Sequence, residues 1–118
     1  MEAALARRGA RFENRVFTPK EIEACHGRPA AGAQFAVRFA AKEALMKAVG
    51  TGWAYGVTWR DIESLAPKGG PFPRAWEIHL DGRAAEIASE LGVKRLHLAA
   101  SRSRTHAMAM VVLETPDR

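Results

Sequence analysis

The sequence has a single cysteine and no long apolar run, and each shortage excludes a class of protein. With only Cys25 among 118 residues, no disulfide can form within the chain, which is typical of a reducing compartment. No apolar stretch approaches the ~20 residues needed to cross a bilayer. The first residues also lack the cationic-then-apolar pattern of a signal peptide. The sequence therefore predicts a cytoplasmic protein with no membrane association.

Negative charge is also in short supply. Lysine and arginine number 18 against 13 aspartates and glutamates, which gives a net charge of +5, and the pI is close to 10. Such an excess favours an anionic partner, either nucleic acid, an acidic protein or a polyphosphate ligand. Aromatic residues are not interleaved with the basic ones as base stacking requires, so nucleic acid is the weakest of the three.

The composition and periodicity present in the chain indicate one α+β domain over residues 1–118. Its hydrophobic fraction is 47% and its charged fraction 26%, as in ordinary globular domains. Helical patterns cover 2–15, 18–25, 31–49 and 82–91, and strand patterns cover 57–65, 75–80, 94–100 and 106–114. A capping box at Thr18–Glu21 and an N-cap at Asp81 mark two helix starts. This order predicts an antiparallel sheet with helices packed on one face.

One stretch, from Arg38 to Gly52, combines charged side chains with a glycine-bracketed turn. Glu43 and Lys47 lie one helical turn apart, so a carboxylate for a hard cation and an ammonium for phosphate share a face. Gly50 can take the left-handed cap conformation, and the turn it begins can approach a phosphate. The plainer interpretation is a solvated helix pair worth roughly 0.2–0.5 kcal/mol. The expected core side chains of this helix are Phe35, Phe39, Leu45, Met46 and Val49.

The first predicted helix carries a basic face. Arg8, Arg11 and Arg15 recur at helical spacing, with Phe12 beside them. Such a face can dock an acidic helix, with Phe12 as the apolar anchor and the arginines giving orientation. Alternatively, the arginines are solvated and Phe12 turns into the core, because phenylalanine is far more often buried than exposed.

The string RFAAKEALMKAVGTG, followed by GVTWRDIE, resembles the signature of the 4'-phosphopantetheinyl transferases. It is most similar to the short bacterial holo-acyl-carrier-protein synthases, and the likeness extends from about Ala4 to Glu114. The fixed positions of that signature are present as Arg38, Phe39, Lys42, Glu43, Lys47, Gly50, Thr51 and Gly52. The resemblance implies the α+β fold of this family and a trimer with active sites at the subunit seams.

The resemblance also implies an activity, which is transfer of the 4'-phosphopantetheine arm of coenzyme A to a serine of apo-acyl carrier protein, releasing 3',5'-ADP. Glu43 would hold Mg²⁺ and, directly or through water, take the serine proton; Lys47 would act beside it as a catalytic residue. The residues expected at the coenzyme are Arg38, Lys42, Lys47, Gly50, Thr51, Gly52, Ser101 and Arg102. Arg8, Arg11, Phe12 and Arg15 would receive the acidic acyl carrier protein.

Two departures from the family pattern leave a second hypothesis open. The family begins with a strand that carries a metal-binding aspartate, whereas the first aspartate here is Asp61. The family's Ser-His pair is Ser101-Arg102 here, and arginine can grip phosphate but cannot share in proton transfer. The chain is therefore expected to be either an active transferase or an impaired family member that binds coenzyme A or a carrier protein without turnover.

Overall fold

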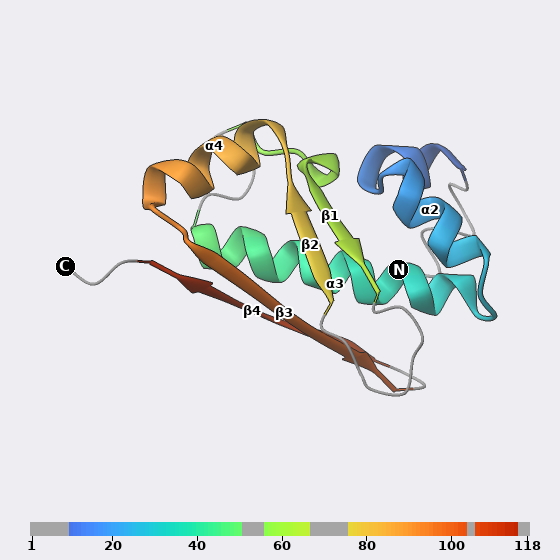
Figure 1. Ribbon diagram of the computed structural model, residues 1–118. Helices are drawn as coiled ribbons and strands as arrows, with labels where there is room; N and C mark the ends of the chain where they lie inside the picture. Colours follow the sequence, from blue (N-terminus) through green and yellow to red (C-terminus); the bar gives the residue numbers. More distant parts are fainter. Residues whose placement is uncertain (1–9, 51–55, 67–75, 104–105, 116–118) are drawn as a thin grey trace.

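The computed structural model describes residues 10–50, 56–66, 76–103 and 106–115 (Figure 1). Of the first predicted helix, the described part is helical over residues 10–16. Arg8, Thr51 and Gly52 lie outside the described residues.

Three helices begin and end close to the residues predicted from the sequence. Helix α2 (Pro19–His26) opens with the capping box, in which the Thr18 backbone N–H donates to Glu21 Oε1 at 3.0 Å. Helix α4 (Gly82–Leu91) is capped by Asp81 and ends at a left-handed Gly92.

Helix α3 (Ala31–Val49) has two unlike ends. It ends at Gly50, whose φ of 73° is a conformation that glycine adopts without strain. It starts after Ala30, whose φ of 56° and ψ of 55° are left-handed and unusual for alanine, and no side chain caps it. The first turn of α3 is therefore less well stabilised than its last.

The four described strands form two separate antiparallel pairs, so the expectation of one sheet is wrong for this part of the chain. Strand β1 (Ile62–Leu65) pairs with β2 (Glu77–Leu80), and β3 (Arg95–Arg102) pairs with β4 (Ala107–Glu114). The strand expected from residue 57 also starts later. Residues Trp59–Asp61 form the 3₁₀ turn η2, because the Asp61 carboxylate accepts the Thr58 N–H at 3.1 Å and holds the backbone in a turn.

Helix α3 runs behind both strand pairs, with α2 near one end and α4 near the other (Figure 1). Two buried apolar clusters fill the space between these elements. One contains Leu45, Met46, Val57, Ile62, Ala84 and Ile87, and the other contains Val16, Phe17, Cys25 and Phe35. Trp59 packs against both, so the two clusters are contiguous. Of the expected core residues, Phe39 and Val49 are only partly buried.

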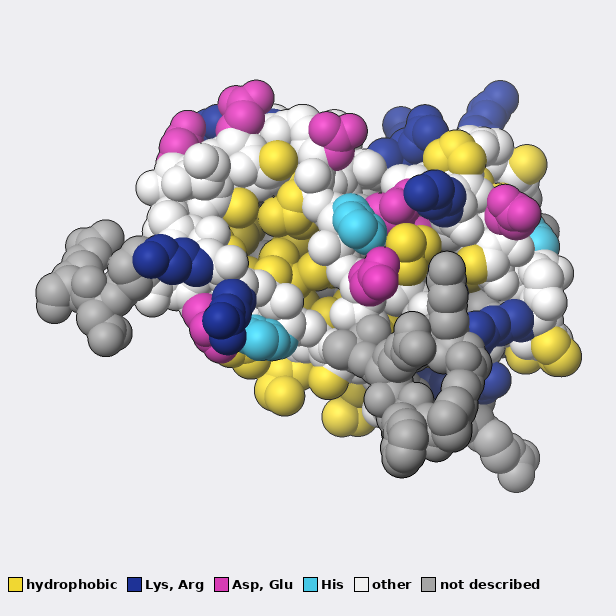
Figure 2. All heavy atoms as spheres, viewed as in Figure 1, with side chains coloured by type: hydrophobic (Ala, Val, Ile, Leu, Met, Phe, Trp, Pro, Cys, Tyr) yellow, Lys and Arg dark blue, Asp and Glu magenta, His cyan; other side chains and the backbone are white. Residues whose placement is uncertain are grey.

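The β3–β4 pair has an apolar inner face and an outer face that is apolar in part. Its inner face packs on α3 through side chains such as Leu98, which is buried. Its outer face exposes Met108, Met110 and Val112 by 68%, 63% and 45%. Figure 2 shows these strands' hydrophobic side chains projecting at the lower edge of the molecule. An exposed apolar patch of this kind marks a contact surface.

Candidate active site

The exposed side of α3 carries the two residues expected to do the chemistry. Glu43 and Lys47 are both exposed, and no ion pair joins them or ties either to another described residue. The solvated helix pair that their spacing allows is thus not formed here. A carboxylate and an ammonium one turn apart and open to solvent can meet a cation and a phosphate.

The end of α3 continues this surface. The Gly50 N–H bonds back to the carbonyl oxygens of Met46 and Lys47, both at 3.1 Å, which closes the helix within one turn of Lys47. A Cβ added at Gly50 would meet no atom of the described residues within 4 Å. Glu43 and Lys47 therefore lie in the C-terminal half of α3, and Gly50 follows directly after it.

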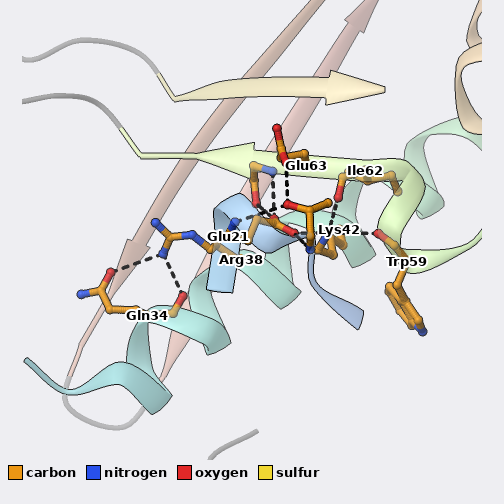
Figure 3. Close-up of polar contacts among 9 residues, drawn as sticks. Glu21, Gln34, Arg38, Lys42, Trp59, Ile62 and Glu63 are labelled. Carbon is orange, nitrogen blue, oxygen red and sulfur yellow. Dashed lines mark hydrogen bonds and ion pairs between the residues drawn. The ribbon is translucent and has the colours of Figure 1, made fainter. Parts of the chain in front are cut away.

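Arg38 lies elsewhere, fully buried in the N-terminal half of the same helix (Figure 3). Its Nη1 donates to the Gln34 carbonyl oxygen at 3.1 Å, and its guanidinium lies 5.3 Å from the ring centroid of Trp76. Its Nε and Nη2 have no hydrogen-bond partner among the described residues. A buried guanidinium with unpaired donors is costly, and a phosphate is an acceptor of the right geometry.

Lys42, which is also expected at the coenzyme, points into the domain in this structure. Its side chain is fully buried, with Nζ 2.7 Å from Glu21 Oε1 and 3.0 Å from the carbonyl oxygen of Trp59. It also donates to the carbonyl oxygen of Ile62 (Figure 3). Burial lowers the pKa of Lys42, and the neighbouring Glu21 carboxylate opposes that change. Lys42 comes one residue before Glu43, about 100° around α3, and so it faces β1 and not solvent.

The remaining residues expected at the coenzyme are distant from this surface. Ser101 and Arg102 are exposed at the end of β3, where they pair with Met108 and Ala107. In Figure 1 this end of the β3–β4 pair lies far from the Gly50 end of α3. A single chain thus brings Glu43, Lys47 and Gly50 together but does not bring Ser101 and Arg102 to them.

The basic helix shows a mixture of the two expected roles. Arg11 and Arg15 are exposed, whereas Phe12 is half-buried and packs against the cluster that contains Phe17 and Phe35. Phe12 therefore contributes to the core while part of its ring stays accessible. His26 Nε2 lies 2.6 Å from Glu13 Oε1 and links this helix to α2.

Three residues near α3 make contacts that the sequence does not predict. Glu21 pairs with Lys42, Ser64 donates to Glu21, and Trp76 lies beside Arg38. The local pattern indicates Glu21 only as a helix cap, and Ser64 and Trp76 only as strand residues. The side chains they contact are remote in sequence, so no local spacing could have indicated these contacts. Asp61 caps η2, and the described residues contain no group of three side chains able to hold a metal.

The fold and the α3 surface together define a class of protein, and comparison with known proteins agrees. Residues 1–110 match the model of the 4'-phosphopantetheinyl transferase superfamily, and the chain belongs to this superfamily. No described helix is long and apolar enough to span a membrane.

Within the superfamily, the relatives are holo-[acyl-carrier-protein] synthases, and the chain is an enzyme of this type. That of Koribacter versatilis is 45% identical over 112 residues, which covers 94% of this chain and 86% of the relative. The synthase of Neisseria meningitidis has a similar structure, with a TM-score of 0.80 at 32% identity over 96% of this chain and 87% of that one, which confirms the α+β fold. The structure of the Helicobacter pylori synthase, solved in complex with coenzyme A, matches with a TM-score of 0.76 at 26% identity. This match covers 96% of this chain and 90% of that one.

Proposed function

We propose that this chain transfers the 4'-phosphopantetheine arm of coenzyme A to a serine of apo-acyl carrier protein and releases 3',5'-ADP. The observation that carries the proposal is the open pair of Glu43 and Lys47 beside the Gly50 turn. The names of the relatives and the coenzyme A complex of the Helicobacter pylori synthase support it.

The proposed chemistry assigns separate tasks to the charged residues of α3. The serine oxygen attacks the β-phosphorus of the coenzyme, and the bond from that phosphorus to the oxygen of departing 3',5'-ADP breaks. Glu43 takes the serine proton, directly or through water, and Lys47 stabilises the charge that develops on the phosphate oxygens. The unpaired nitrogens of Arg38 are proposed to hold another phosphate of the coenzyme.

Magnesium is proposed as the metal, with Glu43 as its protein ligand. One exposed carboxylate fits this ion, which is commonly held by one or two carboxylates together with substrate phosphates. When bound, the ion would neutralise charge on the pyrophosphate.

We also propose that the chain works as a homotrimer with its active sites at the seams. Two observations support this assembly. Ser101 and Arg102 lie far from the Gly50 turn within one chain, so another copy can supply them (Figure 1). The exposed methionines of β4 offer an apolar surface for that contact.

The acidic carrier protein is proposed to dock on the basic helix, where Arg11 and Arg15 are exposed. The net charge of +5 would steer an acidic partner toward the chain. A reducing cytoplasm is the proposed compartment, in keeping with the single cysteine.

The proposal is tested by incubating the protein with apo-acyl carrier protein, coenzyme A and Mg²⁺ and measuring the carrier's mass. One added phosphopantetheine group is expected, and this addition should be lost in Glu43→Gln. An unchanged carrier mass would contradict the proposed transfer.

The alternative, an impaired member that binds without turnover, is favoured by Arg102 because arginine cannot relay a proton. Calorimetry separates the two functions. Binding of coenzyme A without transfer would support the alternative, whereas no binding of either ligand would reject both.

A further inference from the structure

A fully buried ion pair, Glu21–Lys42, lies directly behind the exposed surface of α3. Both side chains have no solvent exposure, and the charged atoms are 2.7 Å apart. Each also has hydrogen-bond partners from the protein. Lys42 donates to the carbonyl oxygens of Trp59 and Ile62.

The Glu21 carboxylate is equally well satisfied. Oε1 accepts the Thr18 N–H at 3.0 Å, and Oε2 accepts both the N–H and the hydroxyl of Ser64 at 2.9 Å. The pair therefore connects α2, α3 and β1 through a network in which each charged group has several partners (Figure 3). Such a buried network is often less stabilising than apolar packing, and its best-attested use is to specify one arrangement over others.

The face of α3 that packs against the rest of the domain is not purely apolar. Its buried apolar residues include Phe35, Leu45 and Met46, and the fully buried Lys42 lies among them. Apolar packing tolerates some repacking, whereas a buried charge must meet its partner, so the charge sets the rotation of the helix more strictly. A rotation by one residue, about 100°, would turn Glu43 toward the core.

Lys42 specifies one rotation of α3. Its ammonium meets a carboxylate and two carbonyl oxygens, and any other rotation of α3 would leave a buried charge unpaired. Because Glu43 is the next residue and Lys47 lies just over one turn further on, fixing Lys42 also fixes the directions of both.

We propose that Glu21 and Lys42 are positioning residues, which hold α3 at the one rotation that presents Glu43 and Lys47 to the substrate. This inference rests on the proposed function. It assigns Lys42 a role inside the domain in place of a contact with the coenzyme.

The test separates positioning from stability by removing the pair in two steps. Glu21→Gln, Lys42→Met and the double variant are compared with the parent for melting temperature and for kcat per folded molecule. Each single variant leaves a buried charge without its partner and is expected to melt at a lower temperature than the double variant. The double variant is expected to recover much of that loss and yet keep a kcat about 10- to 100-fold below the parent.

The outcome that overturns the proposal is a double variant that recovers both its melting temperature and its kcat. If the double variant does not fold, Lys42→Gln is measured, since its amide can still donate to one of the carbonyl oxygens. An unchanged kcat per folded molecule in this variant would likewise overturn the proposal. A parent without transfer, or a Glu43→Gln variant as active as the parent, would instead reject the proposed function.

Discussion

The two strand pairs of this domain are both antiparallel, but they differ in how they are attached to the rest of the chain. The β1–β2 pair is fastened within the chain, because Ser64 bonds to Glu21 and Lys42 bonds to the carbonyl oxygen of Ile62. The β3–β4 pair packs on α3 with one face and leaves methionines on the other exposed. One pair is thus specified by internal polar contacts, and the other presents a surface that another molecule can cover.

The largest effect is expected from breaking the internal attachment of β1. Lys42→Met leaves the buried Glu21 carboxylate without its cation and should lower the free energy of unfolding by about 3–5 kcal/mol. Urea denaturation measures the change. Lys47→Met, at an exposed lysine on the same helix, is the matched control and should stay within about 0.5 kcal/mol of the parent. Equal losses in both variants would mean that the buried pair has no special role.

The next effect concerns the outer face of β3–β4. Met110→Glu places a charge on a surface that is exposed in one chain, so the fold should persist while association weakens by about 2 kcal/mol or more. Light scattering should show the mass falling from that of an oligomer toward 12.9 kDa. Ser89→Glu adds the same charge on exposed α4 and should leave the mass unchanged. A Met110→Glu variant with the parent's mass would exclude this face from assembly.

A smaller effect is expected at the link between β1 and α2. Ser64→Ala removes one hydrogen bond to the Glu21 carboxylate but keeps the backbone bond, and it should cost about 1.5 kcal/mol. Chemical denaturation of this variant is compared with that of Ser89→Ala, whose serine is exposed. Equal free energies of unfolding for the two variants would show that the network tolerates the loss of the Ser64 hydroxyl.

The last effect is absent at neutral pH and develops only on titration of Cys25 in α2, which packs beside β1. Burial raises the pKa of the Cys25 thiol from 9.0 to about 11, so the folded state favours the protonated form. This contribution is present below pH 9 and is lost as the pH rises toward 11, where the free energy of unfolding should fall. A thiol reagent at about pH 8 should react with the folded protein far more slowly than with the unfolded chain. Rapid labelling of the folded chain would contradict the burial of Cys25.

The elements with local signals are predicted well from the sequence. The capping box at Thr18, the Asp81 cap and the glycines after α3 and α4 are short-range features, and these helix boundaries agree with the structure. The pairing of strands depends on contacts between distant residues, so two separate pairs could not be distinguished from one sheet. The η2 turn is not predicted because the side chain of Asp61, not the apolar alternation, decides the local backbone.

The candidate site is predictable only in part for a similar reason. The spacing of Glu43 and Lys47 places them together on any helix, and the structure leaves both exposed. Lys42 shares the helix face of Phe35 and Leu45, but its burial as a charged residue depends on a carboxylate partner. Its partner Glu21 lies on another helix, and a contact between residues so far apart in the sequence produces no periodic pattern that could predict it.

The unlike ends of α3 imply a gradient of local stability along the helix. Its first turn follows a left-handed Ala30 with no side-chain cap, whereas its last turn is closed by Gly50. Amide protons of the first turn should therefore exchange faster than those near Lys42, through brief fraying that leaves the rest of the domain folded. Gln34, which binds the Arg38 guanidinium, belongs to this fraying end. Local opening would give a phosphate a route to the buried Arg38 without disturbing the residues that aim Glu43.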